Sequence, residues 1–170
     1  ELTKIAVNCY LTTKITYANQ VGQVMIRDGM EDEVKTVLKA IGSDSRIGTK
    51  YLNYGFGFGG PCFPRDNRAF AAYASKAGVE TPLGATTDKF NDEHTEFLKE
   101  YFINKNKDNR AYVFHYLTYK DGVDILTESR PYDLALSLLD SGYEVYCLDF
   151  TAKDRMDSRI KFSDFPRMDK

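Results

Sequence analysis

The sequence predicts a mainly helical domain followed by a smaller α/β domain. Through about residue 104, apolar side chains recur at spacings of three and four residues, the period of amphipathic helices. After the polar segment 105–109, two stretches rich in β-branched and aromatic residues flank one further helical pattern. Strand, helix and strand over roughly 40 residues form a βαβ unit, in which both strands run parallel.

The pattern indicates four helices in the first domain, which we expect at 1–28, 30–41, 64–78 and 82–104. The first contains no proline, and Asp28-Gly29 has the composition of a helix stop. Acidic residues in the first turn favour the start of the second. Pro64 suits the first turn of the third, and Gly78 its end. The polar segment 105–109 is then expected to be a hinge between the domains.

The second domain is expected to hold two strands, at 111–119 and 143–150. Between them lies a helix with three leucines on one face, ending at Ser141-Gly142, and these leucines are Leu134, Leu138 and Leu139. The last twenty residues are polar and are expected to be irregular. Two strands bury little surface, so this domain is expected to be incomplete.

The composition is that of a globular protein with nearly balanced charge. Of 170 residues, 42% are hydrophobic and 28% charged, and 23 Lys and Arg face 25 Asp and Glu. A nucleic acid or an anionic membrane as partner would favour a basic surplus, so we expect neither. No apolar run approaches the ~20 residues of a membrane span, and the first residues do not form a signal peptide. Three cysteines cannot all pair, which favours the reducing cytoplasm.

The segment 42–64 carries six glycines, two prolines and five aromatic residues. Long segments of this kind inside a compact domain are usually functional, and closely spaced glycines let backbone N–H groups approach phosphate or sugar oxygens. Cys62 stands at its end, directly before a helix whose N-terminus favours a thiolate. The alternatives are a plain turn-rich loop, and a Cys62 buried as a small hydrophobe.

A second group of candidates lies on the first helix. Lys4 and Asn8 are four residues apart, so both project from one face. A positive charge beside an amide donor can stabilise a developing oxyanion, and Asp66, one turn beyond Cys62, could act on the same site. The alternative is that Lys4 and Asn8 lie on a solvated helix face. In the catalytic case, both should point toward the Cys62 loop, with Asp66 on the rim of the cleft.

The remaining polar and sulfur-containing residues carry weaker signals. Asn19 and Gln20 are expected at the surface or in an interface. His94 and His115 have no partner at catalytic or metal spacing, and His115 is expected to pack in the core. Two further residues lie in apolar patterns, Cys9 and Cys147. No Cys/His set suggests a metal site.

Three segments in this order resemble the UDP-glucose/GDP-mannose dehydrogenase family, and the resemblance covers nearly the whole chain. They are the start of the chain through CYLTTKITYANQ, then DSRIGTKYLNYGFGFGGPCFPRD, and then LTYKDGVDILTES. Most specific is the element Gly-Gly-x-Cys-x-x-x-Asp with RIG sixteen residues before the cysteine. Within the family, FGGPCFPRD is most similar to the members that oxidise UDP-glucose.

The resemblance implies a mainly α central dimerisation domain at 1–106, followed by a partial Rossmann-like α/β UDP-binding domain at 107–170. The family's N-terminal NAD-binding domain is expected to be absent, because no GxGxxG follows a strand here. A homodimer through the first long helix is expected as well. That helix shows more apolar surface than one small domain needs, at Ile15, Ala18, Val21, Val24 and Met25.

The resemblance also assigns chemical roles. It implies that UDP-glucose is oxidised twice, with two NAD, through a thiohemiacetal and a thioester on Cys62. Lys4 and Asn8 match the pair that stabilises oxyanions, and Asp66 matches a carboxylate that positions water. The residues that match the substrate site are Arg46, Tyr51, Phe56, Gly59 and Lys120. Of these, Arg46 matches an arginine that reaches the substrate of the neighbouring subunit. The alternatives are another nucleotide sugar, such as GDP-mannose or a UDP-N-acetylhexosamine, and a non-catalytic dimerisation module.

Three positions depart from the family pattern. Tyr116 stands where a glycine is usual, and Thr127 stands where an arginine usually contacts the cofactor. Pro61 replaces a commoner serine before the cysteine, which removes one N–H donor.

Overall fold

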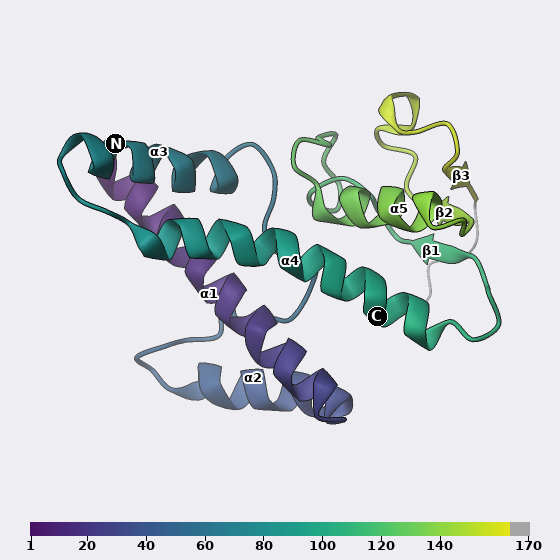
Figure 1. The fold of residues 1–170 in the computed structure, drawn as a ribbon, viewed down its shortest axis with the longest axis horizontal. Helices are drawn as coiled ribbons and strands as arrows, with labels where there is room; N and C mark the ends of the chain where they lie inside the picture. Colours follow the sequence, from purple (N-terminus) through teal and green to yellow (C-terminus); the bar gives the residue numbers. More distant parts are fainter. Residues whose placement is uncertain (164–170) are drawn as a thin grey trace. The chain divides into compact units, whose positions relative to one another are not determined.

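The computed structural model describes residues 1–163 and divides the chain into two compact units. The first unit comprises residues 1–58 and 62–94, and the second comprises 59–61 and the described residues from 95 to 163. Figure 1 shows the elements of both units along the chain, with helices in the first and a small sheet in the second. A mainly helical part followed by a part with parallel strands is thereby confirmed.

The first unit is organised around the long helix α1, Leu2–Arg27. Its buried residues include the polar Thr12 and Asn19, and Ala18, Gly22 and Met25 follow one another at spacings of four and three. Gly29, with φ of 78°, ends the helix, as the sequence predicts. In Figure 1, α2 lies beside the C-terminal half of α1, and α3 lies beside its N-terminal half.

A short 3₁₀ turn, η1 (Glu31–Glu33), precedes helix α2, Val34–Ser43. The turn places three acidic side chains ahead of the α2 N-terminus, where their negative charge interacts favourably with the positive end of the helix dipole. The apolar core of this region joins α1, α2 and the segment after α2, through Ala18, Met25, Val34, Leu38 and Leu52.

Helix α3 spans Phe63–Lys76, with Pro64 in its first turn and Gly78 beyond its end at φ of 74°. Helix α4 spans Pro82–Lys105. The buried side chains of α4 recur with a helical period and are mostly polar, namely Thr87, Asn91, His94, Thr95 and Leu98. The two compact units are divided between His94 and Thr95, inside α4. The domain boundary at residue 106 stays a prediction.

The second unit contains a three-stranded parallel sheet in the order β1-β2-β3. Strands β1 (Tyr112–Phe114) and β2 (Val145–Cys147) are connected through helix α5 (Arg130–Asp140), which confirms the βαβ unit. The core is formed by fully buried side chains of α5, β2 and the segment after β1, namely Leu117, Leu134, Leu138, Val145 and Cys147. Leu139 is only half-buried.

Two expectations for the second unit were wrong in detail. The strands are three residues long, because the chain leaves the sheet after Phe114, where its partner β2 also ends. The last twenty residues are not wholly irregular. They include strand β3 (Lys161–Phe162), which extends the sheet beside β2, and a 3₁₀ turn, η2 (Lys153–Arg155), precedes it. Two residues are too few to show a period of two, so the sequence pattern does not reveal β3.

The packing of α1 against the segment after α2 depends on Gly22. A β-carbon at this position would lie 2.1 Å from the Tyr54 ring. Tyr54 therefore packs directly on the helix backbone, and it also meets the apolar core of the unit.

We expect Gly22→Ala to lower the free energy of unfolding by about 1–3 kcal/mol, because the ring cannot yield without moving its segment. Gly84→Ala is the matched control, since its β-carbon would meet nothing closer than 4.0 Å. In a helix that change should be neutral or stabilise by up to about 1 kcal/mol. Urea unfolding measures both variants, and equal effects would contradict the role of the Tyr54 contact.

Candidate active site

The side chains of Lys4 and Asn8 converge on one carboxylate of α3. Lys4 Nζ lies 2.5 Å from Asp66 Oδ2, and Asn8 Nδ2 donates to the same oxygen at 2.6 Å. The helical spacing of four residues puts both donors on the face of α1 that packs against α3. The alternative of a purely solvated face is therefore wrong, although Lys4 keeps half of its side chain exposed.

Asp66 is buried, with 2% of its surface exposed, so it does not lie on a rim as expected. Burial raises the pKa of Asp66, but hydrogen bonds from Lys4, Asn8 and Arg65 outweigh it and hold this pKa below its usual value. Arg65 binds the second oxygen, Oδ1, through two guanidinium nitrogens at 3.1 and 3.2 Å. The carboxylate is therefore charged at neutral pH and is held on both oxygens.

A buried polar chain supports this cluster from behind. Thr12 Oγ1 donates to Asn67 Oδ1 at 3.0 Å, and Asn67 Nδ2 donates to Asp88 Oδ1 at 2.9 Å. Thr12 and Asn67 are almost fully buried, so these bonds replace water that the side chains have lost. The chain joins α1, α3 and α4 and fixes the first turn of α3, which carries Asp66.

Cys62 is the residue that directly precedes α3, and its side chain is exposed. The Asp66 amide N–H donates to the Cys62 carbonyl at 2.8 Å, so the cysteine begins the same helical turn that ends at Asp66. The alternative of a Cys62 buried as a small hydrophobe is thereby contradicted. Cys9 is different, because burial and the charges of Asp66 and Asp88 raise its thiol pKa and keep it protonated.

Four of the expected substrate residues lie between α2 and α3, and Arg46 and Tyr51 come first along the chain. Arg46 is exposed and forms a bidentate ion pair with Asp44, with a shortest distance of 2.6 Å. Tyr51 has φ of 62°, a left-handed conformation that bulky residues rarely adopt, and its ring contacts Phe63 edge-on. Such strain costs about 1–3 kcal/mol and is concentrated at functional sites.

Phe56, Gly59 and Lys120 occupy different surroundings. Phe56 is half-buried in the first unit. Gly59 belongs to the second unit, where a β-carbon would lie 2.1 Å from the Glu128 carbonyl oxygen, so only glycine fits. Lys120 is exposed in the same unit, and its carbonyl accepts a hydrogen bond from the Thr118 hydroxyl. The role of all three residues in binding a substrate stays a prediction.

The structure places several polar residues differently from the sequence analysis. Asn19 is buried rather than on the surface, with 1% of its surface exposed. His94 is fully buried, whereas His115, expected in the core, is only half-buried. His94 follows Asn91 by three residues and Thr87 by seven on one helix face, but hydrophobicity rules place such polar residues at the surface, so the sequence does not indicate this burial.

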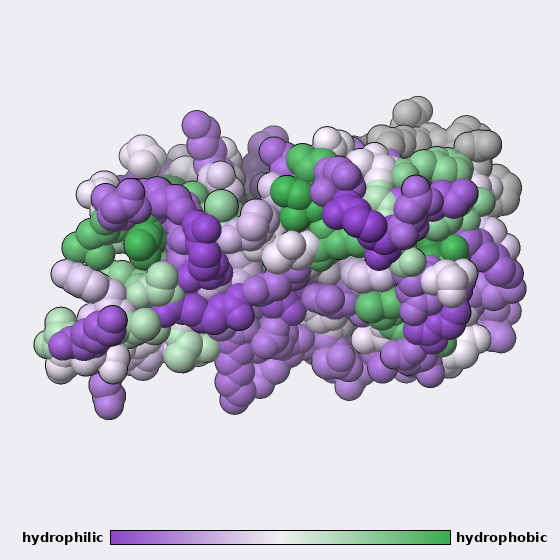
Figure 2. All heavy atoms as spheres, turned by 90° about the horizontal axis from the view of Figure 1, so that it is seen from above, coloured by the Kyte–Doolittle hydropathy of each residue, from purple (hydrophilic) through white to green (hydrophobic). Residues whose placement is uncertain are grey.

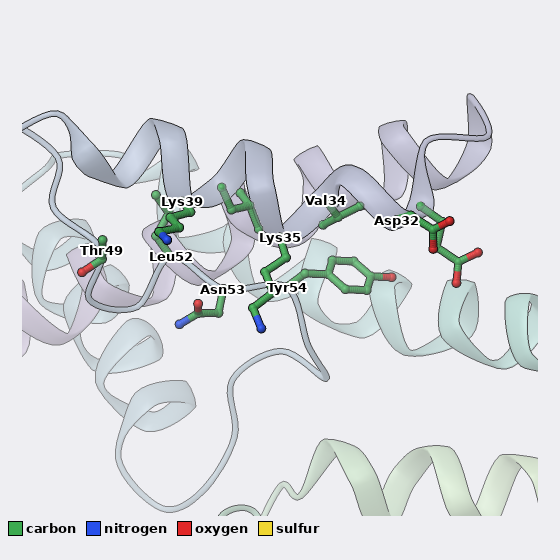
Figure 3. A pocket seen from close by; sticks show the side chains of 10 residues that line it. Asp32, Val34, Lys35, Lys39, Thr49, Leu52, Asn53 and Tyr54 are labelled. Atoms are coloured by element: carbon green, nitrogen blue, oxygen red, sulfur yellow. The ribbon is translucent and has the colours of Figure 1, made fainter. Parts of the chain in front are cut away.

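A pocket of about 480 Å³ lies between α2 and the segment after it. Figure 3 shows Lys35 extending from α2 toward Asn53 and Tyr54, with Lys39 nearby. Its floor is apolar and buried, because Leu52 and its α2 neighbours form part of the core. None of the residues predicted to be catalytic or substrate-binding lines this pocket.

The part of the chain that the structure describes contains no cluster of three His, Cys, Asp or Glu that could hold a metal ion. Among the same residues, no helix has both the length and the apolar character that crossing a membrane requires. On the face drawn in Figure 2, apolar residues form separate patches among polar and charged ones.

Comparison with known proteins decides the family. The sequence profile for the central domain of the UDP-glucose/GDP-mannose dehydrogenase family matches residues 1–93. The chain belongs to this family. Lys4, Asn8, Cys62 and Asp66 all lie within the matched central domain.

Relatives in the family act on more than one nucleotide sugar. The chain is 34% identical over 169 residues to the UDP-glucose 6-dehydrogenase AglM of Haloferax volcanii, covering 97% of this chain and 38% of the relative. It is 30% identical over 151 residues to a GDP-mannose 6-dehydrogenase of Pseudomonas aeruginosa, covering 88% and 34%. The chain thus spans well under half of the length of these relatives.

A solved structure in the family has the same fold. The UDP-glucose dehydrogenase of the hyperthermophilic archaeon Pyrobaculum islandicum is 29% identical, with a TM-score of 0.81. The match covers 95% of this chain and 38% of that one. It extends beyond the central domain, so the sheet of the second unit is part of the family architecture.

We expect Asp66→Asn to lower the free energy of unfolding at pH 7 by about 1–3 kcal/mol, because buried charge-assisted hydrogen bonds are lost. In the parent chain, the pKa of Asp66 is lower in the folded state than in the unfolded state. Its contribution is therefore complete above about pH 4 and is lost as the pH falls through the folded-state pKa. Urea unfolding between pH 7 and pH 2.5 should show this loss, and the variant should lack it.

The control for this experiment is Asp44→Asn, which removes the exposed ion pair with Arg46. Exposed pairs contribute little, and Arg46 also lowers the pKa of Asp44, so this variant should show a loss in the same direction as Asp66→Asn but a much smaller one at each pH. An Asp66→Asn variant that behaved like this control would contradict the assignment of Asp66 as a structural anchor of α1 and α3.

Proposed function

We propose that this chain carries the catalytic thiol and part of the substrate site of an NAD-dependent UDP-glucose 6-dehydrogenase. The enzyme would oxidise the C6 alcohol of UDP-glucose twice to give UDP-glucuronate. The observation that carries this proposal is the meeting of Lys4 and Asn8 at Asp66, one helical turn after an exposed Cys62. A cationic donor, an amide donor, a carboxylate and a thiol are the groups that acyl transfer through sulfur requires.

In the proposed reaction, the Cys62 thiolate attacks the C6 aldehyde of the half-oxidised sugar. A sulfur–carbon bond forms, and the carbonyl electron pair moves to oxygen, which becomes an oxyanion. Lys4 has three N–H donors and Asn8 has two, so each can hold Asp66 and still donate to this oxygen. Their attachment to the buried Asp66 keeps both donors oriented before substrate arrives.

Hydrolysis of the later thioester needs a base and a leaving thiolate. Asp66 is ionised and could accept a proton from the attacking water while the carbon–sulfur bond breaks and Cys62 departs as thiolate. The lowered pKa makes Asp66 a weak base. We therefore assign it chiefly to positioning the water and the two donors.

NAD would accept hydride in this enzyme, but the described residues do not form its site. The connection from β1 to α5 contains a single glycine, Gly122, and no glycine-rich turn that admits a pyrophosphate. We therefore assign NAD to another domain of the whole enzyme. We assign the UDP moiety to the second unit as a partial Rossmann-like domain, with Lys120 among its contacts and Arg46 contributed to a neighbouring subunit. The three free cysteines are consistent with a cytoplasmic enzyme.

Two alternatives remain to be separated. Relatives that act on UDP-glucose and on GDP-mannose are 34% and 30% identical, so a different nucleotide sugar is the nearer alternative. A non-catalytic dimerisation module is the other one, and the exposed Cys62 beside an intact polar cluster weighs against it.

A chimera tests the function. Residues 1–163 replace the matching segment of the Haloferax volcanii UDP-glucose 6-dehydrogenase, and NADH formation is followed with UDP-glucose, GDP-mannose and UDP-N-acetylmannosamine. We expect turnover with UDP-glucose, a loss of at least about 10³-fold in Cys62→Ser, and a smaller loss of about 10²-fold in Asn8→Ala.

The chain alone should produce no NADH, because we assign NAD to another domain and the described residues show no glycine-rich turn after β1 that would admit it. A preference of the chimera for GDP-mannose would contradict the proposed substrate. A folded chimera in which Cys62→Ser is as active as the parent would contradict the proposed chemistry.

We also propose that the enzyme is a homodimer through α1. Ala18 and Met25, expected on the dimer face, are buried inside the unit instead. Val24 is 63% exposed and borders an apolar groove of about 560 Å³, together with Val21, Met30 and Val37. An α1 side chain from a second copy fits such a groove because both copies present the same apolar ridge.

We expect the chain to sediment as a dimer at micromolar concentration, and Val24→Glu to sediment as a monomer, because a charge in the groove would be desolvated on association. Val79→Glu is the control, since Val79 is similarly exposed at 56% but lies between α3 and α4, away from the groove. A monomeric parent chain, or equal behaviour of both variants, would contradict the interface.

A further inference from the structure

The backbone of residues 55–58, in the glycine-rich segment before Cys62, is held by side chains. The Gly55 N–H donates to Asn19 Oδ1 at 2.9 Å, and the Gly55 carbonyl accepts from His94 Nε2 at 2.6 Å. Asn91 binds Phe58 twice, accepting from its N–H at 2.9 Å and donating to its carbonyl at 2.8 Å. We call Asn19, Asn91 and His94 the loop clamp. The amide of Asn91 thus takes the place of a neighbouring strand.

The protonation state of His94 follows from its two partners. A carbonyl oxygen only accepts, so Nε2 carries the proton toward Gly55, and Nδ1 accepts from the Gln23 amide at 2.7 Å. Burial lowers the pKa of His94 more than the bond to Gly55 raises it, which agrees with a neutral ring. The ring also stacks on Phe90 and meets Tyr54 edge-on, so its orientation is fixed on every side.

The loop clamp buries polar side chains at positions where stability alone would favour apolar ones. Its three side chains are at most 2% exposed, and each has lost its contacts with water. Apolar residues of similar size would fill the same space without that desolvation cost. Polar residues instead add directional hydrogen bonds, and each of these bonds specifies one position of the loop backbone. Phe58 is four residues before Cys62, so the clamp acts on the segment that delivers the thiol.

We propose that Asn91 and His94 are positioning residues that hold residues 55–58 in one conformation and thereby fix the place of the Cys62 thiol before α3. This inference rests on the proposed function only in giving the Cys62 thiol a catalytic role. The geometric effect can be measured without any substrate. Neither residue touches the reacting atoms in this proposal, because both act through the loop backbone.

The test compares Asn91→Leu and His94→Leu with His94→Gln and Thr87→Val. Glutamine can restore a donor to Gly55, so His94→Gln should rescue the loop. Thr87 is buried on the same face of α4 but bonds only to its own helix at Leu83, so Thr87→Val is the matched control. The full 170-residue chain is used throughout. Two quantities are measured at pH 7: amide hydrogen exchange at Gly55 and Phe58, and the alkylation rate of each cysteine with iodoacetamide.

Both leucine variants should speed exchange at Gly55 and Phe58 by at least about tenfold, because the loop opens locally. Alkylation of Cys62 should change by at least about threefold, because the segment before it no longer holds the thiol in one position. The buried Cys147 should react as in the parent chain, because its unit does not contain the clamp. Asn91→Asp keeps the shape but replaces the donor to Phe58 with a carboxylate oxygen that faces the Phe58 carbonyl, so it should change exchange in the same direction even if the leucine variants do not fold.

Unchanged exchange in the Asn91 and His94 variants, or an equal effect in Thr87→Val, would overturn the proposal. Parallel changes at Cys62 and Cys147 would also overturn it, because they would indicate general unfolding. None of these readouts depends on turnover. An inactive chimera together with the expected exchange and alkylation results would therefore reject the proposed function while leaving the loop clamp in place.

Discussion

The burial of one charged group, the Asp66 carboxylate, organises the first unit. A buried carboxylate without partners is unstable, and Arg65 of α3 binds only Oδ1, so the donors to Oδ2 come from outside α3. Lys4 and Asn8 meet this demand from α1, and this sets both the rotation of α1 and its pairing with α3. The same contact fixes the position of Cys62, because this residue begins the turn of α3 that carries Asp66. Stability and chemistry therefore depend on the same contact.

Around that contact, the interior between the helices is largely polar. Thr12, Asn67, Asn91 and His94 are all buried, and each has a hydrogen-bond partner on another element. An apolar core tolerates small shifts of one helix over another, whereas a set of directed bonds does not. We interpret this polar interior as the means by which a segment rich in glycine is kept in one conformation without a sheet to support it.

Much of this organisation can be predicted from the sequence, and there is a physical reason why the rest cannot. Helix α1 follows from apolar periodicity, and Gly29, Pro64 and Gly78 mark the ends of α1 and α3 by local geometry. Lys4 and Asn8 could be paired by their spacing, because helix geometry is also local. The burial of Asn19 and of His94 could not be derived this way. Hydrophobicity rules place polar residues outside, and their loop partners are tens of residues away.

The first turn of α3 also limits where the chain can gain or lose residues within the family. Asp66 and Asn67 are neighbours, yet one faces Lys4 and Asn8 and the other faces Thr12 and Asp88. Each residue added to a helix rotates the remainder of that helix by about 100°, so an insertion or deletion between positions 62 and 67 would turn both side chains away from their partners. Insertions in the exposed turn at 77–80, between α3 and α4, carry no such penalty. Length variation should therefore be tolerated in that turn and excluded from positions 62–67.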